Sequence, residues 1–263
     1  MARTVGIGHQ NFETIRREGY FYVDKTDLIR EWWESGDSVT LITRPRRFGK
    51  TLNMSMLEQF FSVKYSGCGD LFEGLSIWQE ERYRRLQGTY PVIAVSFADV
   101  KETSYQDTRK KIGRIVAELY NRLDFLSDSE KLNENEKTLF RQISAGVDGG
   151  LLTDSLKFLS NCLMQHYGKR VIILLDEYDT PMQEAYVNGY WDEMASFIRN
   201  LFNAAFKTNP YLERAIMTGI TRISKESVFS DLNNLKVVTT TSESYASCFG
   251  FTEKEVFAAL EEY

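Results

Sequence analysis

Apolar runs of strand length alternate along the chain with segments of helical period. The runs lie at residues 39–42, 90–97, 171–175 and 214–222. Apolar residues recur at intervals of three and four in the segments between and after them, at residues 52–61, 105–124, 152–163 and 194–205. The runs at 90–97 and 171–175 are nearly unbroken, which is typical of strands covered on both faces. The alternation therefore predicts an α/β domain.

Weaker patterns flank this core. A short strand or turn at 20–27 precedes a helix at 28–34, and residues 236–241 have the composition of a last strand. Thr252 and Glu255 have the spacing of a capping box that begins a helix. We expect an N-terminal extension at 1–38 packed on the core, a central domain at 39–249, and a C-terminal helical segment that begins at 250–263 and is truncated there.

Two segments are predicted to lie outside regular elements. The stretch 124–136 is acidic and poor in apolar residues, so we expect a solvated connection. The stretch 227–235 is rich in turn-forming side chains and predicts a loop or a short helix.

The most informative stretch follows the first apolar run. Residues 43–51 read Thr-Arg-Pro-Arg-Arg-Phe-Gly-Lys-Thr and lead directly into an apolar helical segment. A strand, a loop with glycine and a helix that opens with Lys-Thr have the layout of a P-loop. Arg44 stands where the general pattern has its first glycine, and Pro45 could set an alternative turn there.

A helix N-terminus binds phosphate because its first amides have no intrahelical partner and carry the positive end of the helix dipole. We expect the phosphates at the end of the loop. The candidate binding residues are Arg46, Arg47, Phe48, Gly49, Lys50, Thr51 and Leu52. Lys50 supplies a mobile positive charge for the β and γ phosphates, and the Thr51 hydroxyl can ligate Mg²⁺.

Acidic residues follow the third apolar run, where residues 176–179 read Asp-Glu-Tyr-Asp. Ligands of open α/β sheets lie at the carboxyl ends of strands, so we expect these acids to approach the loop. Asp176 is a candidate to hold Mg²⁺ through its water shell. Glu177 is a candidate general base for the attacking water.

Polar residues end the fourth run as well. Thr218 and Thr221 are candidates to sense the γ-phosphate, and Arg222 is a candidate cationic sensor. A strand threonine chosen for its β-propensity is an equal alternative interpretation of Thr218. Asp24 and Lys25 could line the nucleotide or pair with each other at the surface, and the sequence favours the surface pair.

Composition limits the remaining functions. The net charge of −5 excludes a basic surface that binds nucleic acid over the whole protein, so any contact with nucleic acid would be local. Residues 82–85 are an example of a local basic patch. A solvated helical face is the simpler interpretation of these residues. Three dispersed cysteines and two histidines argue against a zinc site or a disulfide framework. No apolar stretch reaches the length of a membrane span, and we expect a cytoplasmic protein.

The motifs at 20–26, 44–51 and 176–179, with 218–222 and 249–252, resemble the bacterial AAA-ATPase-like family of P-loop NTPases. The family also lacks the first glycine. The resemblance implies a three-layer α/β/α P-loop NTPase fold with a mostly parallel central sheet, in which the acidic strand lies beside the P-loop strand or one strand away. Members often continue into a nuclease-like domain of the PD-(D/E)xK type, which these residues do not contain.

We therefore expect a Mg²⁺-dependent ATPase that couples its nucleotide state to a partner domain or protein, with an oligomer as one arrangement. Two alternatives stay open. One is a nucleotide-dependent binding switch with little hydrolysis, and the other is a small-molecule kinase built on the same loop. The acid pair and the polar strand end favour water as the acceptor.

Overall fold

The computed structural model describes residues 3–223, 228–229 and 232–262. Its strands form a five-stranded, all-parallel sheet in the order β2-β3-β4-β1-β5. The strands are β1 Val39–Thr43, β2 Val92–Ser96, β3 Val171–Asp176, β4 Leu212–Gly219 and β5 Leu235–Val238. The acidic strand β3 is thus one strand away from β1, with β4 inserted between them.

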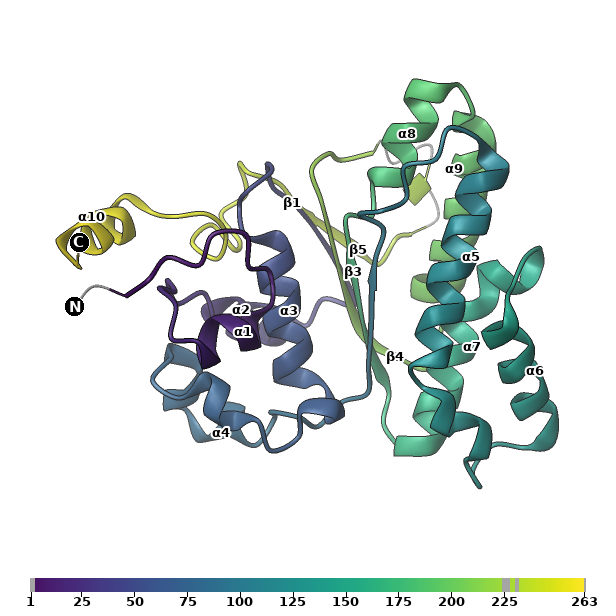
Figure 1. Ribbon diagram of the computed structural model, residues 1–263, viewed down its shortest axis with the longest axis horizontal. Coiled ribbons are helices and arrows are strands. Elements are labelled where there is room, and N and C mark those ends of the chain that lie inside the picture. Colours follow the sequence, from purple (N-terminus) through teal and green to yellow (C-terminus); the bar gives the residue numbers. More distant parts are fainter. Residues whose placement is uncertain (1–2, 224–227, 230–231, 263) are drawn as a thin grey trace.

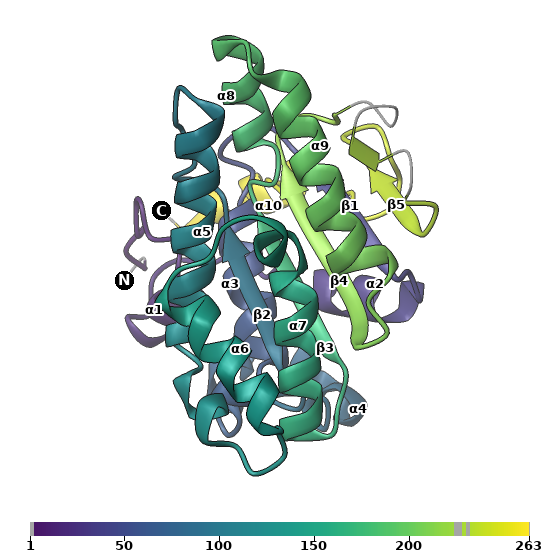
Figure 2. The same cartoon turned by 90° about the vertical axis from the view of Figure 1, so that its right-hand side faces the viewer.

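Helices cover both faces of this sheet, which gives the three layers expected (Figure 1). The first layer consists of α1 Phe12–Arg17, α2 Asp27–Ser35, α3 Lys50–Phe61 and α4 Glu81–Arg84. The second layer consists of α5 Tyr105–Asn121, α6 Glu134–Ala145, α7 Gly150–Tyr167, α8 Thr180–Asn188 and α9 Trp191–Phe202 (Figure 2). A last helix, α10 Glu253–Glu262, lies on the side of the molecule where the amino-terminal segment also lies.

The two layers explain the unbroken apolar run of β3. Successive side chains of a strand point to opposite faces. Ile172 and Leu174 accordingly join the core under α3, whereas Ile173 and Leu175 join the core under the second layer. Every residue of β3 is buried, so this strand is central, as its sequence indicates.

The prediction that the run at 90–97 is covered on both faces is wrong for part of that strand. β2 is an edge strand whose Val92 and Ala94 are half-buried and whose Ser96 is exposed. The side chains of Ile93 and Val95 are buried, because they face the second layer. An apolar run of five residues does not by itself distinguish an edge strand from an inner one.

The solvated connection expected at 124–136 is also more structured than its composition indicates. It contains a short 3-10 helix, Asp124–Asp128, and the start of α6. Leu126 and Leu132 are buried and anchor the stretch on the second layer. Asn133 and Glu136 form a reciprocal capping box that begins α6.

At the chain's end, the helix expected from Thr252 and Glu255 is present as α10. The Thr252 amide donates to Glu255 Oε2 (2.7 Å), and the Glu255 amide donates to Thr252 Oγ1 (3.3 Å). The last strand expected at 236–241 is present in part, because β5 ends at Val238 and residues 239–241 lie outside it. Residues 227, 230 and 231 of the loop expected at 227–235 lie outside the described part of the chain.

Candidate active site

The loop between β1 and α3 has the backbone shape of an anion-binding turn. Gly49 is the N-cap of α3 with φ 76°, and Arg47 also has a positive φ of 68°. Glycine adopts this left-handed conformation at no steric cost, whereas Arg47 is strained in it. No side chain caps α3, so its first amides point toward the space above the loop. The exposed side chains of Arg46, Arg47 and Phe48 border that space.

Lys50 is directed into the loop. It is only 6% exposed, and its Nζ donates to the carbonyls of Arg44 (3.0 Å) and Pro45 (2.9 Å). Burial lowers the pKa of Lys50, and neighbouring carboxylates, that of Asp176 foremost, act against the shift. The ammonium group is therefore held between the loop backbone and the acids at the end of β3.

Thr51, Asp176 and Thr218 meet although they belong to three different elements. The Thr51 hydroxyl donates to Asp176 Oδ2 (2.7 Å), and the Thr218 hydroxyl donates to Asp176 Oδ1. Asp176 is 5% exposed and lies at the carboxyl end of β3. β4 lies between β3 and β1 in parallel register, so the carboxyl ends of all three strands share one edge of the sheet.

Glu177 follows Asp176 with a strained backbone. Its φ of 52° is positive, which is uncommon for a residue with a side chain. The Glu177 amide donates to Asp176 Oδ1 (3.1 Å), and the Thr180 hydroxyl donates to Glu177 Oε2 (3.3 Å). These contacts fix the turn and leave the carboxylate half-buried at the edge of the site.

Tyr178 and Asp179, to which the sequence pattern assigns no individual role, hold the end of β4. Asp179 Oδ2 accepts from the amides of Ile220 (3.0 Å) and Thr221 (2.8 Å) and from the Thr221 hydroxyl (2.8 Å). The Tyr178 hydroxyl donates to the Thr221 carbonyl (2.7 Å). A Cβ atom on Gly219 would lie 2.5 Å from the Tyr178 ring, so only glycine fits there. An alternation-based analysis cannot assign such pairings, because they cross between strands.

Thr221 and Arg222 lie farther from this centre than Thr218. The Thr221 hydroxyl donates a hydrogen bond to Asp179, and Arg222 is exposed beyond the end of β4. Of the predicted sensors, the structure therefore brings Thr218 alone into hydrogen-bond contact with Asp176.

Arg44, at the position of the missing glycine, is directed away from the loop interior. Its side chain is 4% exposed, donates to the Thr43 carbonyl (3.0 Å) and to the Tyr245 carbonyl (3.4 Å), and stacks over the Phe249 ring at 5.4 Å. Arg44 thus joins the start of the loop to the segment that precedes α10.

The Asp24–Lys25 surface pair favoured by the sequence is not formed. Lys25 is 7% exposed and donates to Glu255 of α10 (2.7 Å) and to the Ser247 carbonyl (2.8 Å). Asp24 accepts instead from the Thr26 hydroxyl (2.6 Å) and from the Ser76 amide (2.7 Å). Two adjacent residues of opposite charge therefore fix two different segments.

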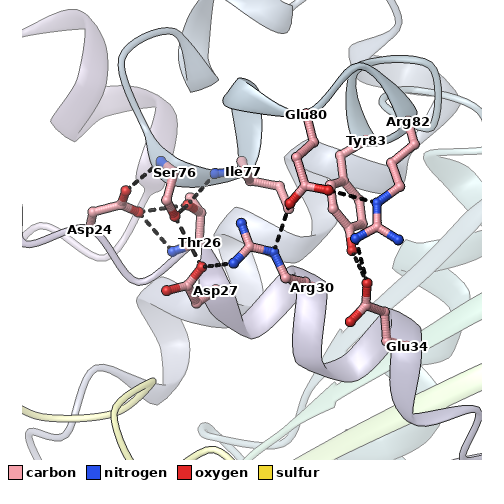
Figure 3. A network of polar contacts seen from close by, with 10 residues as sticks. All are labelled: Asp24, Thr26, Asp27, Arg30, Glu34, Ser76, Ile77, Glu80, Arg82 and Tyr83. Carbon is pink, nitrogen blue, oxygen red and sulfur yellow. Dashed lines mark hydrogen bonds and ion pairs between the residues drawn. The ribbon is translucent and has the colours of Figure 1, made fainter.

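The arginine-rich stretch at 82–85 belongs to a polar network around α2 and α4 (Figure 3). Arg82 pairs with Glu34 (2.7 Å) and Glu80 (2.8 Å), and the buried Tyr83 donates to Glu34 (2.6 Å). Arg85 pairs with Glu81 (2.6 Å). The network supports the interpretation of this stretch as a solvated helical face.

The donors of the site suit a nucleoside triphosphate with Mg²⁺. A hydroxyl and a carboxylate, from Thr51 and Asp176, are hard oxygen ligands of the kind that Mg²⁺ prefers, and they are already 2.7 Å apart. The first amides of α3 have no side-chain cap and the Lys50 ammonium lies in the same loop, so both suit phosphate. No helix of the described residues has both the length and the apolar character that a membrane crossing needs.

Comparison with known proteins agrees with this geometry. A family model described as AAA-ATPase-like, "Predicted AAA-ATPase", matches residues 6–229. The chain is 30% identical over 256 residues to an "Uncharacterized protein in vnfD 5'region" of Azotobacter chroococcum mcd 1. The match covers 97% of this chain and 44% of that protein, so the chain spans less than half the length of its relative. No solved structure matches.

Proposed function

The chain belongs to the family described as predicted AAA-ATPase, and from this membership and the geometry of the loop we propose that it binds ATP with Mg²⁺ and hydrolyses the bond between the β and γ phosphates, which releases ADP and phosphate. The amides at the start of α3 would hold the phosphates. Lys50 would exchange its two carbonyl partners for phosphate oxygens. The residues that surround the polyphosphate would be Arg46, Arg47, Phe48, Gly49, Lys50, Thr51 and Leu52.

Thr51 and Asp176 would hold the magnesium ion, Thr51 directly and Asp176 through water. When bound, the ion neutralises charge on the phosphates. The chain's own contribution is to keep both ligands in place, because Thr218 and the Glu177 amide fix the other oxygen of Asp176.

Glu177 would orient the attacking water and accept its proton. A positioned general base contributes a factor of about 10² to 10⁴ to the rate. Thr218 and Arg222 would respond to the γ-phosphate from the end of β4. Thr218 is the better supported of the two, because it already contacts Asp176.

The single observation that carries this proposal is the hydrogen bond from Thr51 to Asp176. These residues are 125 positions apart, and the contact joins the phosphate-binding loop to the acidic strand. Neither a surface lysine at a helix start nor a solvated acidic turn would produce it.

The test is Mg²⁺-dependent hydrolysis of ATP and GTP by the wild type, Lys50→Ala and Glu177→Gln, with nucleotide binding measured separately. We expect Lys50→Ala to lose binding. Glu177→Gln should bind as the wild type does and lose about 10²-fold or more in turnover. Equal binding and turnover by all three proteins would exclude the assigned roles.

We further propose that nucleotide state is passed to a partner through the segment before α10. The Gly250 amide donates to the Phe48 carbonyl of the loop (3.1 Å), and Asn53 of α3 donates to the Cys248 carbonyl (2.8 Å). Phe257 and Leu260 of α10 are 58% and 65% exposed and could contact that partner. Single-turnover kinetics distinguish an ATPase from a switch with little hydrolysis.

A further inference from the structure

The outer edge of β2 is open in the part of the chain that the structure describes. The Phe97 amide donates to the Asp176 carbonyl (3.0 Å), and the Ile172 amide donates to the Pro91 carbonyl (3.0 Å). In a parallel ladder, residues that face one neighbour alternate with residues that face the other side. The amides and carbonyls of Val92, Ala94 and Ser96 therefore point away from β3, and among the described residues no backbone group pairs with them.

The chain itself shows that this edge accepts a further strand. Just before β2, Ser62 forms a parallel bridge with Tyr90. The Val63 amide donates to the Tyr90 carbonyl (2.8 Å), and the Tyr90 amide donates to the Phe61 carbonyl (2.8 Å). Residues 61–63 thus pair with Tyr90 on the outer side of this strand. Farther along the same side, the outward backbone groups of Val92, Ala94 and Ser96 have no backbone partner among the described residues.

A groove follows this free edge between the two helical layers. Two adjoining cavities of about 560 Å³ and 510 Å³ share the lining residues Glu58, Ala94 and Arg122. One wall is α3 and the other is α5, with β2 as the floor. The side chains of an added strand would point alternately toward α3 and α5, as those of the existing strands do.

The groove wall formed by α5 is rich in cations. On α5 it presents Lys111, Arg114 and Arg122 beside Glu118, whereas the acids Glu58, Asp99 and Asp176 line the other parts of the groove. Within the described residues none of the three cations forms an ion pair. Farther along, the groove meets Phe125 and Tyr167, whose side chains are 38% and 39% exposed. Carboxylates would complement the first region and apolar side chains the second.

We propose that the outer edge of β2 binds an extended segment of a partner protein as a sixth strand, with acidic side chains toward α5 and apolar side chains beside Phe125 and Tyr167. Backbone hydrogen bonds supply affinity in this mode, and alternate side-chain positions supply specificity. The groove ends at Thr51 and Asp176, so the bound segment reaches the proposed nucleotide site. The proposal stands on the strand edge and does not depend on ATP hydrolysis.

The probe is a displayed library of random decapeptides, selected on the wild-type chain and then measured on two variants. Ala94→Pro removes an outward amide without removing a hydrogen bond to β3, and proline is tolerated on edge strands. Ala94→Ser keeps the amide and is the matched control. We expect the selected peptides to carry acidic residues in one half and apolar residues in the other, and to bind Ala94→Pro about tenfold more weakly than Ala94→Ser.

Two further measurements do not depend on the folding of a variant. Methylation of alternate amides in a selected peptide should abolish binding to the wild type, and hydrogen exchange should show protection at residues 92–96. Equal binding of methylated and unmethylated peptides, protection confined to another surface, or a library without any enriched sequence would overturn the proposal. Self-association of the chain with protection at 92–96 would also overturn it, because the occupant would then be a second copy.

Discussion

At the scale of single residues, the two aspartates of the 176–179 motif have different surroundings. Asp176 Oδ2 accepts from a hydroxyl, that of Thr51, which can rotate toward another partner. Asp179 Oδ2 accepts from the Thr221 hydroxyl and the Gln183 side chain, and also from the backbone amides of Ile220 and Thr221, which cannot rotate away. Asp176 is therefore available to a cation, whereas Asp179 positions the end of β4.

Asp179→Ala should lower the free energy of unfolding by about 2 kcal/mol, because the partly buried amides of Ile220 and Thr221 would lose a charged acceptor. The loss in free energy of unfolding should be smaller for Asp179→Asn, since the side-chain amide oxygen can still accept hydrogen bonds. Urea denaturation measures both. Asp154→Ala on the exposed face of α7 is the control and should stay within about 0.5 kcal/mol of the wild type. If Asp179→Ala matched this control, Asp179 would have no positioning role.

Glu58 gives the stability a pH dependence. Burial raises the pKa of the Glu58 carboxyl, against the opposing charges of Lys64 and Arg122. A carboxyl whose pKa is higher in the folded state favours folding while it is protonated, and this contribution is lost as the pH rises through the raised pKa. Ionised Glu58 thus opposes folding at pH 7.

Glu58→Gln should therefore raise the free energy of unfolding at pH 7, and the gain over the wild type should disappear at about pH 3, where Glu58 is protonated in both the folded and the unfolded state. Urea denaturation at the two pH values measures the difference. The exposed Glu130→Gln serves as the control for a charge change alone. A gain of equal size at both pH values would show that burial of the charge is not the cause.

At the scale of elements, the sequence predicts what depends on local period and fails where partners are distant. The buried strand β3 and the helix α5 follow from apolar runs and from spacings of three and four. The edge position of β2 does not follow, because burial of Ile93 and Val95 on one face leaves the same apolar run. The acidic first turn of α6 looks like a solvated connection in the sequence, although acidic residues in a first turn stabilise the N-terminus of a helix.

The same distinction applies to the candidate site. The sequence predicts that the loop and the acids of the 176–179 motif lie close together, because strand ends in a parallel sheet meet at one edge. The ion pair of Lys25 cannot be predicted in this way, since its partner Glu255 is 230 residues away in the sequence. The positioning role of Asp179 cannot be predicted for the same reason, because its partners Ile220 and Thr221 follow β4 and are distant in the sequence.

The contact between Lys25 and Glu255 should hold α10 against the body of the molecule. The ion pair is 2.7 Å long and its lysine is largely buried. The Lys25 contact helps to lower the pKa of Glu255, although burial opposes that shift. A lowered pKa means that this stabilisation is present at neutral pH and is lost as the pH falls through the carboxyl range.

Glu255→Gln should therefore speed amide exchange in residues 253–262 at pH 7 by about tenfold, the value of one charge-assisted hydrogen bond. Lys25→Met should have a similar effect. Hydrogen exchange with mass spectrometry measures both, and Lys254→Met, a change of an exposed neighbouring cation, is the control. Exchange as slow as in the control would mean that other contacts hold α10.

At the scale of the whole molecule, the loop between β1 and α3 is joined to the C-terminal part of the chain. Arg44, Phe48 and Asn53 hold the segment 245–250 from three points of the loop and α3. A Cβ atom on Gly250 would lie 2.9 Å from the Phe48 ring, so the two segments are in close contact. We therefore expect a change in the loop on nucleotide binding to reach this segment.

Mg²⁺-ATP should therefore change amide exchange in two regions at once: residues 44–53, which would contact the nucleotide, and residues 245–250, which would not. Hydrogen exchange with and without nucleotide measures this, and Lys50→Ala should show neither change. Asn53→Ala removes the bond to the Cys248 carbonyl and should keep the first change while weakening the second. Protection confined to residues 44–53 in the wild type would separate nucleotide binding from the C-terminal segment, and coupling through α10 would then be excluded even if ATP is hydrolysed.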